Sequence, residues 1–519
     1  MAIRMSGLNS GLDTEAIVKE LMKAEDQKVT NIKNKQTKLE WKTDKWKDLN
    51  TKISTFYTGK LSNARFESTF NAKKANVADS TVATVTAQSG AVNGTHSLAV
   101  KQLAQAKSYT SWQYKDITGS SKLTDVKDTS TGKSLFRAGQ TFTISCYKDG
   151  KIEQVEENGT KRDKTVSFTI GADDTVNTMI TKMQEAGVNA SFDSTEHRFY
   201  FSSKSSGAEN YYKMTSSDGT AIEDILGGST IDGKDAVFYL DGTEYTKSSN
   251  TNSINGLDIT LTGTTKDYDL LSTRVSTAIT VTSDTDAAYK NVKELLKEFN
   301  EVLTAVYDAY NADDADDYDI LTDDQKEEMS DDEEKEWNDK IKSALLRRDD
   351  NAKDVLSHLQ NDLTGAVVTV NGKKFSLSSF GISSVVYTEH GKLHIDGDSD
   401  DELTSGNEDK LKKALTEDPD TTAKALSQLF SKLYGSTKKG ERTGLSAIAY
   451  ESNDYKSAQK FYNDKQYTKL AADYKTELRK MQEKVSAVEE RYYDQFTQME
   501  KALSTINSQT SSLSGLIGS

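Results

Sequence analysis

Apolar side chains recur at alternating three- and four-residue intervals at both ends of the chain. Neither glycine nor proline occurs from Asp13 to Thr58 or from Leu445 to Leu513. This spacing is that of a coiled-coil seam and predicts a long amphipathic helix at each end. The N-terminal seam reads Ile17, Leu21, Ala24, Val29, Ile32, Gln36, Leu39, Thr43, Trp46, Asn50 and Ile53; the C-terminal seam reads Leu470, Tyr474, Leu478, Met481, Val485, Val488, Tyr492, Phe496, Met499, Leu503 and Ile506.

The first helix is expected to begin after Leu12, with Asp13 or Thr14 as its N-cap. If it continues to Phe56, it is about 60 Å long at 1.5 Å per residue. Two such helices at opposite ends of one chain are most simply partners. Their inner turns, near Trp46 and Tyr474, are expected only to hold the termini together. The outer apolar positions lie beyond any core and predict contact with another subunit.

The middle of the chain alternates apolar and polar residues over short runs, which predicts strands joined by tight turns. The predicted strands cover Ser80 to Ala87, His96 to Val100, Ala236 to Leu240 and Leu257 to Leu261. Between them lies a compact unit: a strand from Val166 to Ile170, a helix capped at Asp174 or Thr175 and ended by Gly187, and strands from Val188 to Phe192 and Arg198 to Ser202.

Helical periodicity returns after the strands. One helix is predicted from Asp286 to Tyr310 and another from Lys340 to Leu363. The segments Val367 to Phe375 and Val385 to Ile395 read as strands, and Asp409 to Ala414 and Thr421 to Phe430 as helices. The order helix, strands, helix implies that domains are inserted one within another.

Composition narrows the function classes. The formal net charge of -15 argues against non-specific nucleic-acid binding, and no window holds the ~20 apolar residues that span a bilayer. Cys146 is the single cysteine, so no intramolecular disulfide is expected. The N-terminus lacks the pattern of a cleaved signal peptide. Both a cytoplasmic location and export as an unfolded chain stay open.

Candidate chemistry is sparse. His390, His394, Asp396 and Asp398 are the one cluster of metal-type residues, but the turn at Gly391 leaves no three-ligand pattern. The acidic run from Asp313 to Glu336 lacks the glycine and glutamate of an EF-hand loop and is read as a solvated face. We therefore expect no catalytic residue, no cofactor and no metal site, and a protein that is not an enzyme.

Several motifs, in order, resemble the flagellar filament capping protein family, the FliD or hook-associated proteins. They are Ser6 to Thr14 with Ile17-Val18, Phe66 to Ser68 with Ala78-Asp79, Leu98 to Ala104, Val166 to Ser202, Ala236 to Thr262, and Gln495 to Glu500. The unit from Val166 to Ser202 resembles an insertion module shared with flagellins.

The resemblance implies an α+β multidomain fold, with paired terminal coiled-coil legs, a helical domain next to them and two nested β-rich head domains, one with the flagellin-type strand-helix-strand insertion. The expected divisions are residues 1–42 with 468–519, 43–75 with 282–467, 76–135 with 236–281, and 136–235.

The resemblance further implies a ring-like homo-oligomer at the distal tip of the flagellum, outside the cell, exported by the flagellar secretion apparatus without a cleaved signal peptide. It would retain unfolded flagellin and promote its insertion at the filament tip or hook-filament junction. A cytoplasmic export chaperone is expected on the C-terminal helix, and neither nucleic acid nor membrane insertion is expected. The residues expected to contact the filament and other subunits are Leu8, Leu12, Ile17, Leu21, Leu503, Ile506, Leu513 and Leu516.

Three alternatives stay open. A flagellin or a hook-filament junction protein would also pair terminal helices around β domains. An adhesin would use the exposed β domains, in particular Phe136 to Leu226, and is compatible with a cap. A carboxylate-dependent glycosidase or peptidase has almost no positive support in the sequence.

Overall fold

The computed structural model describes residues 11–157, 160–266, 275–436, 442–449 and 460–517. The chain forms two compact units. The terminal unit consists of Met1–Phe70 and Thr285–Ser519, and the middle unit is Asn71–Asp284. The chain therefore leaves the terminal unit once and returns to it once. Among the described residues, no helix is long and apolar enough to cross a membrane.

The first helix, α1, extends over Thr14–Phe56. Asp13 is its N-cap, as one of the two predicted caps, and its carboxylate accepts a hydrogen bond from the Ala16 N–H at 2.9 Å. The helix continues into a π-helical turn, Tyr57–Leu61, in which Gly59 has a non-helical backbone (φ -93°, ψ -105°). The predicted continuous helix of about 60 Å is thus present.

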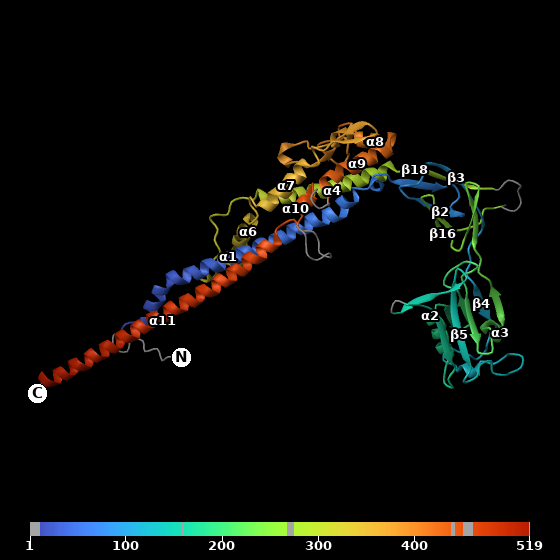
Figure 1. Ribbon diagram of the computed structural model, residues 1–519, viewed down its shortest axis with the longest axis horizontal. Coiled ribbons are helices and arrows are strands. Elements are labelled where there is room, and N and C mark those ends of the chain that lie inside the picture. Colours follow the sequence, from blue (N-terminus) through green and yellow to red (C-terminus); the bar gives the residue numbers. More distant parts are fainter. Residues whose placement is uncertain (1–10, 158–159, 267–274, 437–441, 450–459, 518–519) are drawn as a thin grey trace. The chain divides into compact units, whose positions relative to one another are not determined.

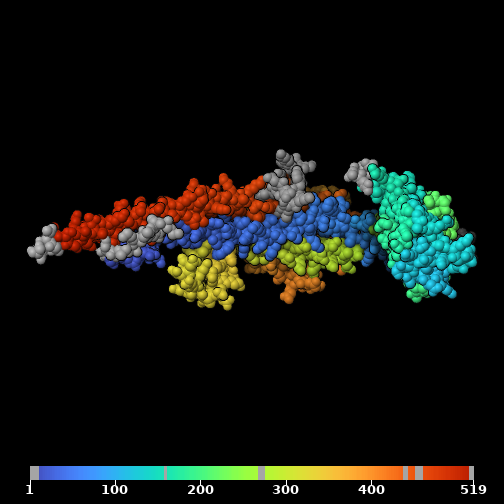
Figure 2. All heavy atoms as spheres, turned by 90° about the horizontal axis from the view of Figure 1, so that it is seen from below, coloured from blue at the N-terminus to red at the C-terminus, as the bar shows by residue number. Residues whose placement is uncertain are grey.

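The last helix, α11, extends over Asp464–Ile517 and lies antiparallel to α1 (Figures 1 and 2). Aromatic rings pack around the inner end of α1, one from the residues just before α11 and one from helix α9 (Pro419–Tyr434). Trp46 stacks on Tyr462 with ring centroids 5.4 Å apart, and Tyr57 stacks on Tyr434 at 4.3 Å. All four side chains are buried or nearly so. The inner end of the α1–α11 pair, which we call the stalk, is therefore part of a hydrophobic core.

The core of the terminal unit forms around α4, Thr285–Tyr310, whose apolar face packs on α1, α7 and α8. That face has the predicted helical spacing and is buried at Val292, Leu295, Phe299, Val302 and Val306. The other helices are α5 (Asp323–Glu327), α6 (Asp331–Ala344), α7 (Asp350–Asn361), α8 (Lys410–Glu417), α9 (Pro419–Tyr434) and α10 (Leu445–Ile448); two small hairpins pair β19 (Val368–Val370) with β20 (Lys373–Phe375) and β21 (Ile382–Ser383) with β22 (His394–Ile395).

Three predicted elements in this unit are wrong. The single strand from Val367 to Phe375 is the hairpin of β19 and β20, which turns at Asn371 and Gly372. The single helix from Lys340 to Leu363 is two helices, because Arg348 adopts a left-handed backbone (φ 54°) and Asp349 caps a new helix. The strand from Val385 to Ile395 reduces to β22 at its end. The segment before β22 forms a 3₁₀ turn, Tyr387–Glu389, which stops at His390 with φ 60°.

The middle unit contains two hydrophobic cores. The first lies between a five-stranded sheet, in the order β1-β18-β3-β14-β15, and a three-stranded sheet, β16-β17-β2. The predicted strands Ala236–Leu240 (β14) and Leu257–Leu261 (β17) are confirmed at both ends. The other strands are β1 (Lys73–Val77), β2 (Ala83–Ala87), β3 (Gly94–Gln102), β15 (Thr243–Lys247), β16 (Thr251–Ile254) and β18 (Thr277–Ser283).

The second core lies between the sheet β10-β11-β4-β13, the strands around β5, and helix α2, Val176–Ala186. Thr175 caps α2, and Gly187 ends it with φ 107°, a backbone that favours glycine. Both residues were predicted. The remaining elements are β4 (Ser108–Ser111), β5 (Thr141–Lys148), β6 (Lys151–Ile152), β7 (Gln154–Glu157), β8 (Thr160–Asp163), β9 (Thr165–Thr169), β10 (Asn189–Asp193), β11 (Arg198–Ser202), β12 (Tyr212–Ser216), α3 (Ile222–Leu226) and β13 (Gly228–Ile231).

Candidate functional site

The seam that α11 turns toward α1 is only half covered. Each predicted seam residue of α11 from Leu470 to Leu503 is half-buried, and most of their neighbours on the helix are exposed. A two-helix pair shields one side of each apolar stripe and leaves the other side in water. The paired terminal helices therefore carry a long apolar strip with room for a further partner.

The two helices of the stalk end at different points. The Lys42 ammonium lies 5.9 Å from the centre of the Tyr467 ring. Farther out, Lys28 is the main cause of a lowered Glu25 pKa, and Lys484 of α11 adds to it. Figure 1 shows that α11 continues past the beginning of α1.

The outer turns of α1 face α11 with a different stripe from the predicted one. Val18 and Met22 are buried, whereas Ile17 is half-buried and Leu21 is 45% exposed. The sequence offers the doublets Ile17-Val18 and Leu21-Met22, and spacing alone cannot say which member turns inward. Leu21 and Leu12, also 45% exposed, thus remain outside the pair.

The projecting end of α11 exposes the other expected contact residues. Leu503 is half-buried, Ile506 is 54% exposed and Leu513 is 61% exposed. Leu8 lies outside the described residues. Leu516 belongs to α11, but its side chain is not among those described. The structure therefore brings Leu503, Ile506 and Leu513 onto one helix end and places Leu12, Ile17 and Leu21 near the start of the other helix.

Farther in, a polar cluster fixes the stalk to the helical core. The Asp349 carboxylate caps α7, pairs with the Lys42 ammonium at 2.7 Å, and accepts a hydrogen bond from the Tyr467 hydroxyl at 3.2 Å. Burial pushes the pKa of Asp349 upward, but the hydrogen bond from Lys42 helps to hold it below its usual value. This ionised carboxylate joins α1, α7 and α11.

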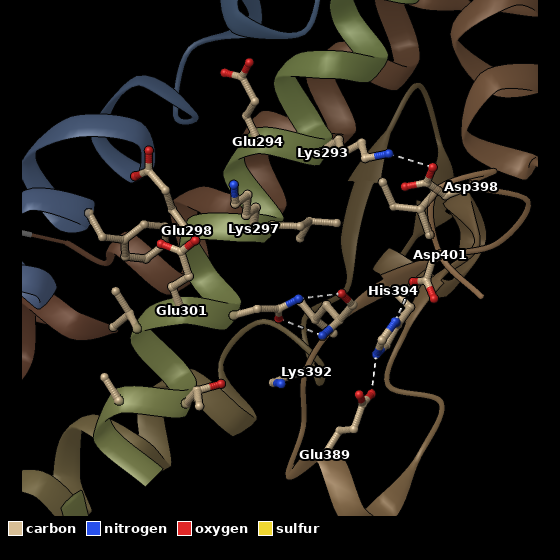
Figure 3. Close-up of a pocket in the computed structure, with 18 of the residues that line it drawn as sticks. Lys293, Glu294, Lys297, Glu298, Glu301, Glu389, Lys392, His394, Asp398 and Asp401 are labelled. Carbon is tan, nitrogen blue, oxygen red and sulfur yellow. Dashed lines mark hydrogen bonds and ion pairs between the residues drawn. The ribbon is translucent and has the colours of Figure 1, made fainter. Parts of the chain in front are cut away.

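A groove of about 1370 Å³ opens beside the inner part of the stalk (Figure 3). Its floor is the polar face of α4, one wall is the last turns of α1, and the other is the segment 389–402. The Asn300 amide holds that second wall to α4, since it donates to the Leu393 carbonyl at 2.8 Å and accepts from the Leu393 N–H at 2.9 Å. Sequence reasoning missed this groove, although the charged face of α4 was a signal for it.

Two of the candidate metal residues, His394 and Asp398, line this groove, and the candidates already have partners. Both His394 ring nitrogens lie 2.6 Å from carboxylates, Nδ1 from Asp401 and Nε2 from Glu389. The Asp398 carboxylate pairs with Lys293, and the His390 ring stacks on Tyr307. Within the described ranges, no group of His, Cys, Asp and Glu is arranged to hold a metal ion.

Cys146, the other candidate for chemistry, is buried in the middle unit. Burial raises the pKa of its thiol, which disfavours the thiolate that a nucleophile needs. It packs as a small apolar side chain in the second core.

Comparison with known proteins identifies two matching family models. The model described as flagellar hook-associated protein 2 N-terminus matches residues 10–107, and the one described as its C-terminus matches residues 233–508. A flagellar hook-associated protein 2 of Halalkalibacterium halodurans is 27% identical over 566 residues, 98% of this chain and 99% of the relative. One from Thermotoga maritima is 28% identical over 57% of this chain and 43% of its own.

The comparison with solved structures also found matches. A crystal structure of the flagellar cap protein FliD D1-D2-D3 domains from Escherichia coli covers 76% of this chain and 97% of its own, with 16% identity and a TM-score of 0.48. A FliD (HAP2) structure from Pseudomonas aeruginosa covers 45% of this chain and 99% of its own, with 17% identity and a TM-score of 0.30.

Proposed function

Since the C-terminal family model alone matches more than half of it, this chain belongs to the flagellar hook-associated protein 2 family, and we propose that it caps the distal end of the bacterial flagellar filament. It would sit outside the cell as a homo-oligomer, retain exported unfolded flagellin and promote its polymerisation. We assign it no catalytic role.

The observation that carries this proposal is the projecting end of α11. Ile506 and Leu513 expose large apolar side chains on a helix that has outrun α1. Apolar side chains in water favour association, and a free amphipathic helix end suits docking against other helices. We propose that this end and the exposed Leu12 and Leu21 contact the filament tip and neighbouring subunits.

The same exposure motivates two further proposals. An apolar helix end would associate prematurely before export, so we propose that a cytoplasmic chaperone covers it. Export without a cleaved signal peptide fits the N-terminal sequence and stays a proposal. The four-part division expected from the sequence also stays a prediction; because one core takes in Tyr109 to Leu226, we propose that the inserted domain begins at β4.

A substitution test separates the contact residues from the helix that carries them. The triple variant L503S/I506S/L513S keeps α11 but removes its exposed apolar side chains. We expect cells that carry it to leak monomeric flagellin and to grow short or no filaments. The matched control S504A/S508A/S512A changes the same turns and should leave filament length unchanged.

One outcome would contradict this proposal. Full-length filaments and no flagellin leakage from the triple variant would show that this helix end does not act in capping. Electron microscopy of the purified wild-type protein tests the alternative class: polymeric filaments would favour a flagellin, and small plate-like rings a cap.

A further inference from the structure

We propose that the groove between α1 and α4 receives the lysine-bearing hairpin β19–β20 from a second copy of this chain, so that copies join head to tail through their terminal units. This inference rests on the proposed function, because it names the interface of the proposed homo-oligomer.

The groove has an excess of negative charge. Nine carboxylates and five lysines line it. Several of them neutralise one another: Lys293 pairs with Asp398 and Asp400 at 2.7 Å each, and Glu294 pairs with Lys60 at 2.6 Å. The remaining carboxylates set the sign of the groove, which would attract a basic partner.

Asp308 and Glu402 are lining carboxylates outside these pairs, and so are Glu298 and Glu301. Glu298 and Glu301 lie one turn apart on α4, on the side nearest α1, while Lys293 turns toward the opposite wall (Figure 3). No ion pair joins either of them to another described residue. Burial raises the pKa of Glu298, and the neighbouring Glu301 and Glu294 raise it further against the opposing effect of Lys60. A cation placed between Glu298 and Glu301 would relieve this repulsion.

The hairpin β19–β20 carries the complementary charge. Its turn, Asn371-Gly372, has both residues at positive φ (51° and 76°), the geometry of a tight two-residue hairpin. Lys373 and Lys374 follow the turn and are exposed, and neither forms an ion pair with another residue in the described ranges. The Asn371 amide donates to the Thr421 hydroxyl at 3.1 Å and so fixes the turn to α9.

This hairpin does not fill the groove of its own chain. None of its residues lines the groove, and its strand β19 packs on α9. The two complementary surfaces therefore occupy different places on one terminal unit. A contact between them in two copies is heterologous, and such a contact repeats to give a closed ring or an open helix. A rigid, positively charged ridge and a negatively charged groove would fix the register of that repeat.

Charge reversal tests the interface in purified full-length protein. The variants E298K/E301K and K373E/K374E should each weaken self-association at least about tenfold, because each places like charges across the contact. The quadruple variant restores opposite charges within one chain and should associate like the wild type. Mixing the two double variants should likewise restore assemblies. Sedimentation velocity at low and high salt reads the assembly, which should weaken as salt screens the charges.

Controls and contrary outcomes complete the test. D316K/D317K and K33E/K35E reverse exposed charges outside the groove and hairpin and should leave assembly unchanged; circular dichroism verifies that every variant is folded. A wild-type protein that stays monomeric at low salt, double variants that assemble normally, or a quadruple variant without rescue would overturn the inference. Sedimentation of the purified protein does not depend on filament growth. A failure of this test is therefore distinguishable from a failure of the capping test on the α11 residues.

Discussion

The Asn50 side-chain oxygen accepts a hydrogen bond from the Phe461 backbone N–H at 2.7 Å, across 411 positions of sequence. Both residues are buried, Asn50 to 8% exposure and Phe461 to 1%. The bond gives the buried Phe461 N–H an acceptor just before the last helix begins. This explains why the polar Asn50 occupies a position that the seam predicts to be apolar.

Replacing Asn50 with alanine should lower the free energy of unfolding of the terminal unit by about 1–3 kcal/mol, because the Phe461 N–H is then buried without an acceptor. Urea denaturation followed by tryptophan fluorescence measures the change. Thr51→Ala, at the exposed neighbouring position, should stay within about 0.5 kcal/mol of the wild type. Equal losses in the two variants would contradict the role given to Asn50.

Leu21 and Val18 lie on adjacent faces of α1, so an aspartate substitution at each position should change a different property of the protein. Val18→Asp buries a carboxylate against α11 and should loosen the outer stalk, seen as faster hydrogen exchange in residues 14–30. Leu21→Asp should leave that exchange unchanged and weaken assembly instead. If Leu21→Asp speeds exchange as much as Val18→Asp, Leu21 belongs to the intramolecular seam.

Asp349 should make the stability of the terminal unit depend on pH in the acidic range. Its pKa is lower in the folded protein than in the unfolded chain, so its stabilisation is full above the unfolded value near 4 and is lost as the pH falls through the folded value. Asp349→Asn still caps α7 but cannot pair with Lys42. We expect the wild type to exceed this variant by about 2 kcal/mol at pH 6.

That difference should shrink steadily below about pH 4, and urea titrations at several pH values measure it. A difference that stays constant between pH 6 and pH 3 would show that the Asp349 charge contributes nothing to stability.

Lys107 and Glu223 form a largely buried ion pair in the middle unit, 2.8 Å apart with side chains 16% and 13% exposed. Lys107→Met leaves Glu223 without a cation and should cost about 3 kcal/mol, measured by hydrogen exchange of peptides within residues 105–226. Lys122→Met breaks the exposed pair with Asp173 and should cost less than about 1 kcal/mol. In the double variant K107M/E223L, part of the loss should be recovered.

Where one strong local rule governs, the sequence predicts the structure closely. The cap at Asp13, the cap at Thr175 and the helix end at Gly187 follow from hydrogen bonding and backbone sterics within a few residues. The seam of α11 agrees with the structure from Leu470 to Leu503, where each predicted position is half-buried. The fold class, long terminal helices around a β-rich middle, is confirmed.

The predictions failed where residues distant in sequence determine the local structure. The break at Arg348 has no glycine or proline to announce it; tertiary contacts hold that residue in a left-handed backbone. The segment before His394 alternates apolar and polar residues like a strand. It does not form one, because the His394 ring pairs with the carboxylates of Glu389 and Asp401. The groove beside α4 arises only when three distant segments meet, so the charged face of α4 could indicate one side of it but not the groove itself.

The antiparallel pairing of α1 with α11 has a consequence for how the protein folds. α1 and its partner are far apart in sequence, since 411 positions separate Asn50 from Phe461. Closing this contact orders a loop of nearly the whole chain, a costly and slow step by the usual dependence of folding rate on sequence separation. The stalk is therefore expected to form late in folding, and a chain without α11 has an unpaired α1 instead of a stalk.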